Sequence, residues 1–166
     1  MKTLLVMRHA KSSWDSPQLK DFARPLAQRG LDDIPKMAAR LRARGASVEA
    51  IVCSPAERTL STAALLAAQL GLEPSRVNSN PELYFAGAPM LLRAVQGFDD
   101  GLEAVMLVGH NPAVTDFVNA LAGLSLDNVP TGGILEFSLP IERWSQLELE
   151  SGTLLDFDYP KREAQA

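Results

Sequence analysis

The stretch Leu4–His9, with the sequence LLVMRH, decides how this chain folds. An unbroken apolar run without polar alternation is typical of a strand that is buried on both faces of a parallel sheet. The stretch Val105–His110, VMLVGH, has the same pattern and also ends in a histidine. Because ligands of open α/β sheets bind at the carboxyl ends of the strands, we expect His9 and His110 to share one ligand-binding edge.

The segment between these two strands alternates between helical and strand patterns. Apolar residues repeat at i, i+3, i+4 and i+7 within residues 31–44, which predicts an amphipathic helix. Residues 50–53 form a further apolar strand, and Ser54-Pro55 after it is typical of an N-cap followed by proline at the first helical position. We therefore expect a helix over residues 55–70 and a weaker one over residues 89–96.

The spacing of apolar residues changes in the last third of the chain. A helix is expected after Pro112, and apolar residues then alternate with polar ones in residues 135–139, 147–150 and 155–159, which predicts half-exposed strands. The expected fold is α/β: a three-layer sandwich with a mostly parallel central sheet flanked by helices, and with antiparallel strands near the C-terminus.

Length and charge set limits on the domain organisation and the partners. The 166 residues, 46% of them hydrophobic, predict a single domain over residues 1–160 and a disordered polar tail over residues 161–166. The net charge of -4 argues against binding to nucleic acid or to an anionic membrane. The apolar run before Arg8 is too short for a signal peptide or a membrane span, so a cytoplasmic location is expected. The sequence leaves the oligomeric state open.

Residues 11–28 form the longest stretch without a clear period, and we expect a loop there. Within it, Asp21 and Arg24 either shape the rim of a pocket or pair with each other, and the sequence does not decide between these two roles. The single cysteine, Cys53, excludes an internal disulfide. It lies in an expected buried strand, which favours a core position over a reactive thiol.

Histidine and arginine side chains at the expected sheet edge are suited to phosphoryl transfer. His9 would be the nucleophile, because a neutral imidazole attacks phosphorus. Arg8 and Arg58 would bind the phosphoryl oxygens with their guanidinium forks, and their charge would favour the neutral form of His9. His110 would donate a hydrogen bond to a phosphoryl oxygen.

The distribution of these histidines does not fit a metal site. The chain has two histidines and one cysteine, with no His-x-x-x-His pair and no acidic residue directly beside either histidine. We therefore expect neither a metal nor another cofactor.

Three blocks of the sequence resemble the histidine phosphatase superfamily, which has the phosphoglycerate-mutase-like fold. Arg8-His9-Ala10 is similar to its Arg-His-Gly signature, with alanine in place of the glycine. Ser54–Thr62, SPAERTLST, resembles its Ser-Pro-x-x-Arg-x-x-x-Thr block, and Val108–Pro112, VGHNP, resembles the block that carries its second histidine. The order and spacing of the blocks agree over nearly the whole chain.

Within this superfamily the chain is similar to the short SixA-like branch of phosphohistidine phosphatases. Arg24-Pro25-Leu26 with the following Gly30, and Thr131-Gly132-Gly133, resemble segments of that branch. No insertion is long enough to form a cap over the site. The resemblance implies a metal-independent phosphatase that forms a phosphohistidine intermediate on His9 and acts on phosphohistidine carried by proteins.

The resemblance also implies roles for individual residues. Glu82 lies where mutase-like members carry their acidic proton donor, which makes it the candidate acid, whereas the SixA-like branch is thought to work without one. The other interpretation of Glu82 is a carboxylate that pairs with an arginine of the pocket or caps the next turn. The candidate site comprises the catalytic residues His9, Arg8, Arg58 and His110, and the substrate-binding candidates Lys11, Ser12 and Asn111.

Two alternative functions remain open. The first keeps the pocket but takes a small phosphomonoester, such as a sugar or nucleotide phosphate, and would give Glu82 a task because an alkoxide leaves less easily than an imidazole. The second is a non-catalytic module that binds phosphate or a phosphoprotein with the same cations. In such a module His9 would have no chemical task.

Overall fold

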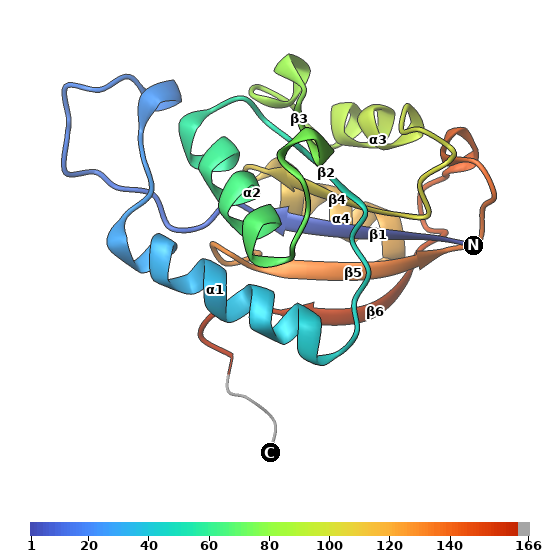
Figure 1. Cartoon of the computed structure of the whole chain (residues 1–166). Coiled ribbons are helices and arrows are strands. Elements are labelled where there is room, and N and C mark those ends of the chain that lie inside the picture. Colours follow the sequence, from blue (N-terminus) through green and yellow to red (C-terminus); the bar gives the residue numbers. More distant parts are fainter. Residues whose placement is uncertain (163–166) are drawn as a thin grey trace.

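The sheet places side by side the two strands that lead into His9 and His110 (Figure 1). The computed structural model describes residues 1–162 and contains a six-stranded sheet in the order β3-β2-β4-β1-β5-β6. Neighbouring strands are parallel from β3 to β1 and antiparallel from β1 to β6, which confirms the predicted arrangement. The strands are β1 (Lys2–Arg8), β2 (Ala50–Cys53), β3 (Val77–Ser79), β4 (Ala104–Gly109), β5 (Ile134–Leu139) and β6 (Thr153–Asp158).

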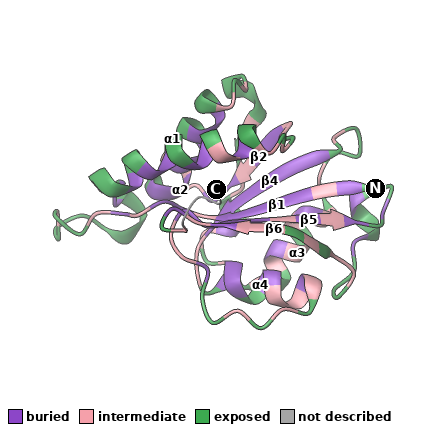
Figure 2. Ribbon diagram, turned by 90° about the horizontal axis from the view of Figure 1, so that it is seen from below, coloured by how far each residue is buried: buried purple, intermediate pink, exposed green. Residues whose placement is uncertain are grey.

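Two helices cover each face of the sheet (Figure 2). Helices α1 (Gln28–Ala43) and α2 (Glu57–Gln69) lie on one face, and α3 (Ala88–Gln96) and α4 (Ala113–Ala122) lie on the other. The side chains of β1 alternate between the two cores: Leu4 and Val6 pack with residues of α3 and α4, and Leu5 and Met7 pack with residues of α1 and α2. Because both sides of β1 are buried, its apolar run is continuous, and the predicted three-layer sandwich is confirmed.

Helix α2 begins later than the sequence predicts. Its first residue is Glu57 and its N-cap is Ala56, whereas a start at Pro55 with Ser54 as the cap is expected from the sequence. The hydroxyl of Ser54 is directed to a histidine instead, as described below. Helix α1 begins earlier than expected, at Gln28, and includes Pro35.

The prediction of a strand over residues 147–150 is wrong. A short 3-10 turn, η4 (Trp144–Gln146), precedes this segment, and the carbonyl of Leu147 accepts a hydrogen bond from Gln96 on α3. Glu150 then adopts a positive φ of 61°, which is incompatible with a strand. The alternating side chains therefore belong to a loop. Strand β3 was not predicted, because its sequence, VNS, contains no apolar run.

Three further expectations concern single regions. Cys53 is fully buried, and burial raises the pKa of its thiol to about 11, which fits a core residue. Most of the tail expected over residues 161–166 lies outside the described residues, although Arg162 donates a hydrogen bond to the carbonyl of Phe157. Among residues 1–162, no helix is both long and apolar enough to cross a membrane.

Candidate active site

Three neighbouring strands end at one edge and bring their following residues together. Arg8 at the end of β1 is in register with Gly109 at the end of β4, and Cys53 at the end of β2 is in register with Val108. The residues that follow these strands are His9, His110 and Ser54. The loop after β1 extends beyond this edge, in the direction in which the β1 arrow points in Figure 1.

The two histidines meet as the sequence predicts. Their ring centroids are 5.5 Å apart, and both rings line a cleft at the carboxyl edge of the sheet. Of the residues assigned from the sequence to catalysis, proton donation or substrate binding, Glu82 alone is not a lining residue. The cleft is lined by Arg8, His9, Lys11, Ser12, Trp14, Arg24, Arg58, His110, Asn111 and Thr131.

The orientation of the His9 ring determines which of its nitrogens carries the proton and which carries the free lone pair. Its Nδ1 lies 2.8 Å from the carbonyl oxygen of Ala10, and because a carbonyl oxygen only accepts, Nδ1 carries the proton. In the neutral ring the lone pair is then on Nε2. Ala10 does not need a positive φ, since within residues 1–162 Glu150 is the one non-glycine residue with that conformation. Alanine therefore fits where the family signature has glycine.

The surroundings of both histidines favour the neutral imidazole. Burial lowers the pKa of His9 to about 3, opposed by the hydrogen bond to Ala10 and assisted by the charges of His110, Arg58 and Arg8. Burial, followed by the charge of Arg58, lowers the pKa of His110 to about 4. Desolvation is thus the principal cause, and the arginines that the sequence suggested contribute less. At neutral pH the Nε2 of His9 is unprotonated and nucleophilic.

His110 is held by a residue that the sequence analysis missed. The Oγ of Ser54, which is fully buried, lies 2.8 Å from Nε2 of His110. Nδ1 of His110 is buried and has no hydrogen-bond partner among the described residues. The serine of the Ser-Pro pair therefore orients this imidazole rather than capping α2.

Three arginines line the cleft. Arg8 donates from Nη1 to the carbonyl of Val129 at 3.0 Å, and Arg58, on the first turn of α2, is almost completely buried. Arg24 donates from Nη2 to the hydroxyl of Ser12 at 2.6 Å, and its guanidinium carbon lies 3.2 Å from the ring centroid of Trp14. The cleft therefore combines two neutral imidazoles with several fixed cations, a pattern that is suited to binding a phosphoryl group.

The sequence left two roles open for Asp21, and the structure shows both. Asp21 lies in the 3-10 turn η1 (Asp21–Ala23), and its carboxylate pairs with Arg24 at 3.2 Å. It also pairs with Arg58 at 3.0 Å and accepts a hydrogen bond from the hydroxyl of Tyr84 at 2.6 Å. Asp21 thus borders the cleft through the arginines that line it.

The other candidates differ in how the fold uses them. Asn111 lines the cleft, but its amide oxygen accepts from Thr115 in the first turn of α4, and its amide nitrogen donates to Asn128 and Val129. Lys11 and Ser12 lie directly on the cleft wall. Gly30 of α1 is packed against this segment, because a Cβ built there would be 2.3 Å from the carbonyl oxygen of Lys11.

Glu82 does not join the site that the structure forms. It lies in the 3-10 turn η3 (Pro81–Leu83), it is exposed, and it does not line the cleft. The backbone N–H group of Glu82 is already engaged, because it donates a hydrogen bond to the side chain of Asn80. Tyr84, two residues later, reaches the site instead, with its ring centroid 5.7 Å from that of His110.

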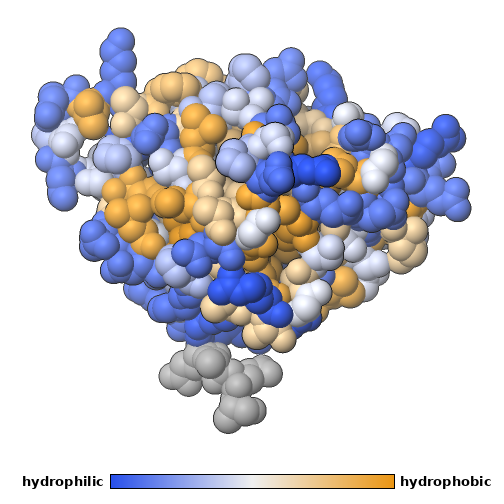
Figure 3. Space-filling view, in the orientation of Figure 1, coloured by the Kyte–Doolittle hydropathy of each residue, from blue (hydrophilic) through white to orange (hydrophobic). Residues whose placement is uncertain are grey.

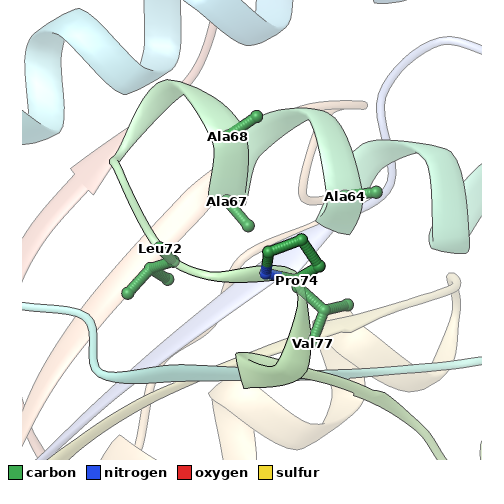
Figure 4. Close-up of a pocket in the computed structure, with 6 residues that line it drawn as sticks. All are labelled: Ala64, Ala67, Ala68, Leu72, Pro74 and Val77. Atoms are coloured by element: carbon green, nitrogen blue, oxygen red, sulfur yellow. The ribbon is translucent and has the colours of Figure 1, made fainter.

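A second hollow lies away from these cations. Apolar side chains gather in the middle of the face shown in Figure 3, where α2 lies. The close-up in Figure 4 shows a pocket there between α2 and the segment that leads into β3, lined by Ala64, Ala67, Ala68, Leu72, Pro74 and Val77. Without a charged or polar side chain in its wall, this pocket has nothing to bind a phosphoryl group. Within residues 1–162, no group of three or more histidine, cysteine, aspartate or glutamate side chains is arranged to hold a metal ion.

Both histidines should make the stability of the protein depend on pH. The pKa of His9 is about 3 in the folded chain and 6.5 ordinarily, so between these values the unfolded chain binds a proton that the folded chain does not. The free energy of unfolding is therefore expected to decrease as the pH falls from 7 to 5. Urea unfolding at both pH values measures this, and His9→Gln should reduce the difference. An unfolding midpoint that is unchanged or higher at pH 5 would contradict this expectation.

Comparison with known proteins relates this geometry to a family. Residues 4–85 match the family described as the histidine phosphatase superfamily, branch 1. The chain is 29% identical to an uncharacterized protein of Mycobacterium leprae over 93% of this chain and 100% of that protein.

Solved structures show the same likeness over the whole fold. One is named as a phosphohistidine phosphatase SixA from Agrobacterium tumefaciens, with 25% identity, a TM-score of 0.80 and coverage of 96% of this chain and 98% of that one. Another is the protein histidine phosphatase SixA complexed with tungstate, with 25% identity, a TM-score of 0.80 and coverage of 95% and 97%.

Proposed function

This chain belongs to the SixA-like branch of the histidine phosphatase superfamily, and we propose that it removes phosphoryl groups from phosphohistidine carried by proteins. The observation that carries the proposal is the hydrogen bond from Nδ1 of His9 to Ala10, which leaves the Nε2 lone pair for attack on phosphorus. The relatives described as SixA supply the class of substrate. The proposed partner is thus a protein that bears phosphohistidine, bound at an uncapped cleft.

The proposed reaction has two transfers. In the first, Nε2 of His9 forms a bond to phosphorus while the bond from phosphorus to the substrate imidazole breaks. In the second, water attacks phosphorus, the bond to Nε2 of His9 breaks, and inorganic phosphate leaves. Arg8, Arg58 and His110 are assigned to the phosphoryl oxygens, whose charge they stabilise in both transition states. Lys11 and Ser12 are assigned to substrate binding.

The leaving group explains why this site does without a carboxylic acid. When the other ring nitrogen of a phosphohistidine carries a proton, the group departs as neutral imidazole and needs no further proton. The exposed position of Glu82, outside the cleft, fits this assignment. An alkoxide leaving group would require a proton donor, and the acidic candidate, Glu82, does not line the cleft.

The test compares two substrates with and without a metal chelator. The wild-type protein should release phosphate from a phosphohistidine-bearing protein much faster than from para-nitrophenyl phosphate, and the chelator should not change either rate. Glu82→Gln is expected to retain the wild-type rate within about twofold, as is usual for an exposed residue outside a site. A strong preference for the ester that disappears in Glu82→Gln would instead support a phosphatase of small phosphomonoesters.

A further inference from the structure

A single residue of the long loop contacts the buried arginine of the cleft at two points. Nη1 of Arg58 donates to the backbone carbonyl of Asp21 at 2.8 Å, and Nη2 donates to Oδ2 of Asp21 at 3.0 Å. Within the described part of the chain, both side-chain hydrogen bonds of Arg58 thus go to one partner. Each terminal nitrogen of the guanidinium retains a second N–H group, which is available to a ligand.

Asp21 is itself held by two other segments. Tyr84, just after η3, donates its hydroxyl to Oδ2 of Asp21 at 2.6 Å, and Arg24 donates to Oδ1 at 3.2 Å. The ring of Phe22, the next residue after Asp21, packs edge-on against Tyr84 with centroids 5.0 Å apart. The carboxylate is therefore fixed from both sides, although about half of its side chain is exposed to solvent.

This arrangement separates Asp21 from a simple surface ion pair. A surface pair orders two mobile side chains and contributes little. Here the side chain of Arg58 is 91% buried, and the carboxylate of Asp21 accepts hydrogen bonds from two further donors. The hydroxyl of Tyr84, and after it the arginines, lowers the pKa of Asp21 to about 2. The carboxylate is therefore ionised throughout the neutral range, and its contact with Arg58 persists.

We propose that Asp21 is a positioning residue that holds the guanidinium of Arg58 in the orientation required for phosphoryl transfer, with Tyr84 holding Asp21 in turn. This inference rests on the proposed function, because it assigns Arg58 to the phosphoryl group. An arginine that is held before the substrate arrives has less conformational freedom to lose in the transition state. The loop between β1 and α1 thereby takes part in catalysis without contacting the substrate through Asp21.

A double-mutant cycle tests whether Asp21 acts through Arg58. Asp21→Ala should lower kcat/KM about ten- to a hundredfold, the loss expected when a catalytic group is misplaced by about 1 Å. In an Arg58→Ala background the same substitution should change kcat/KM less than about twofold, because the residue it positions is absent. A merely structural role for Asp21 would lower activity by the same factor in both backgrounds, and this additive result would overturn the proposal.

Conservative variants provide a second readout. Asp21→Asn keeps the backbone carbonyl and one side-chain acceptor and should recover part of the activity that Asp21→Ala loses. Tyr84→Phe removes only the hydroxyl and should lower kcat/KM about two- to fivefold in the wild type, with no further loss in the Asp21→Ala background. Asp156→Asn is the matched control, because Asp156 also lies between two arginines, Arg44 and Arg162, but outside the cleft.

The design keeps the failure of this inference apart from the failure of the proposed function. The double-mutant cycle is measured on para-nitrophenyl phosphate as well as on the phosphohistidine-bearing protein. Calorimetric titration of the same four proteins with inorganic phosphate measures the coupling in binding, where no turnover occurs. Turnover of the ester alone would contradict the proposed substrate, but the kinetics on the ester would still measure the coupling between Asp21 and Arg58. Fast turnover of phosphohistidine with an unchanged Asp21→Ala variant would contradict the positioning role alone.

Discussion

His9→Ala is expected to abolish phosphate release, lowering kcat/KM by on the order of 10⁴ to 10⁶, the range found when a nucleophile is removed from a covalent mechanism. The physical reason is that His9, among the described residues that line the cleft, is the one to which attack on phosphorus is assigned. Nε2 of His9 is directed by the hydrogen bond from Nδ1 to Ala10, and it is unprotonated because burial lowers the pKa of the ring to about 3. The arginines would still bind phosphate in the variant.

The measurement should follow the intermediate as well as the product. Mass spectrometry of protein that is quenched in alkali during turnover should find one phosphoryl group on His9 in the wild type and none in His9→Ala. Phosphate binding by His9→Ala, measured by calorimetry, controls for collapse of the cleft. A variant that retains more than about a tenth of the wild-type rate, or an adduct on His110, would contradict the assignment of the nucleophile.

The continuous apolar strands made much of this fold predictable. Strands β1 and β4 are buried on both faces, so their sequences cannot alternate, and their carboxyl ends necessarily share one edge because the strands are parallel. This is why the sequence alone predicts that His9 and His110 meet. The short edge strand β3 lacked that signal, since its residues are exposed or half-buried.

The start of α2 shows how a local pattern can be overridden by a distant contact. Ser54-Pro55 has the composition of a helix cap, but Ser54 directly follows β2, and the neighbouring strand β4 leads into His110. Its hydroxyl therefore hydrogen-bonds to the imidazole, and the helix begins at Glu57. A cap is decided within four residues, whereas this hydrogen bond joins residues that are 56 positions apart in the chain.

The environment of Arg58 was beyond prediction for a similar reason. Its contacts to Asp21 cross 37 positions, and the contact from Tyr84 to Asp21 crosses 63. Residues 11–28 have no period that would place Asp21 on any face of an element. The types of residue in the cleft were therefore predictable, but the contacts that fix their orientation were not.

Arg58→Lys is expected to lower kcat/KM about a hundredfold, similar to the removal of one donor from an oxyanion site. The substitution keeps the positive charge, so electrostatic attraction alone predicts a small effect. The guanidinium, however, makes two donations to Asp21 and retains further N–H groups in fixed directions. A single ammonium lacks this planar fork, so it does not hold Asp21 at two points and bind two phosphoryl oxygens at once.

Steady-state kinetics on both substrates measures the loss, and Arg76→Lys on the exposed turn η2 (Pro74–Arg76) is the matched control. Because the fork is required mainly for the geometry of the transferred group, the loss should be larger in kcat than in KM. Guanidinium added at millimolar concentration should restore part of the activity of Arg58→Ala, which has space for it, and none of the activity of Arg58→Lys. If kcat/KM of Arg58→Lys is within threefold of the wild-type value, Arg58 contributes only its charge. The contacts with Asp21 would then stabilise the loop and would not orient Arg58 for catalysis.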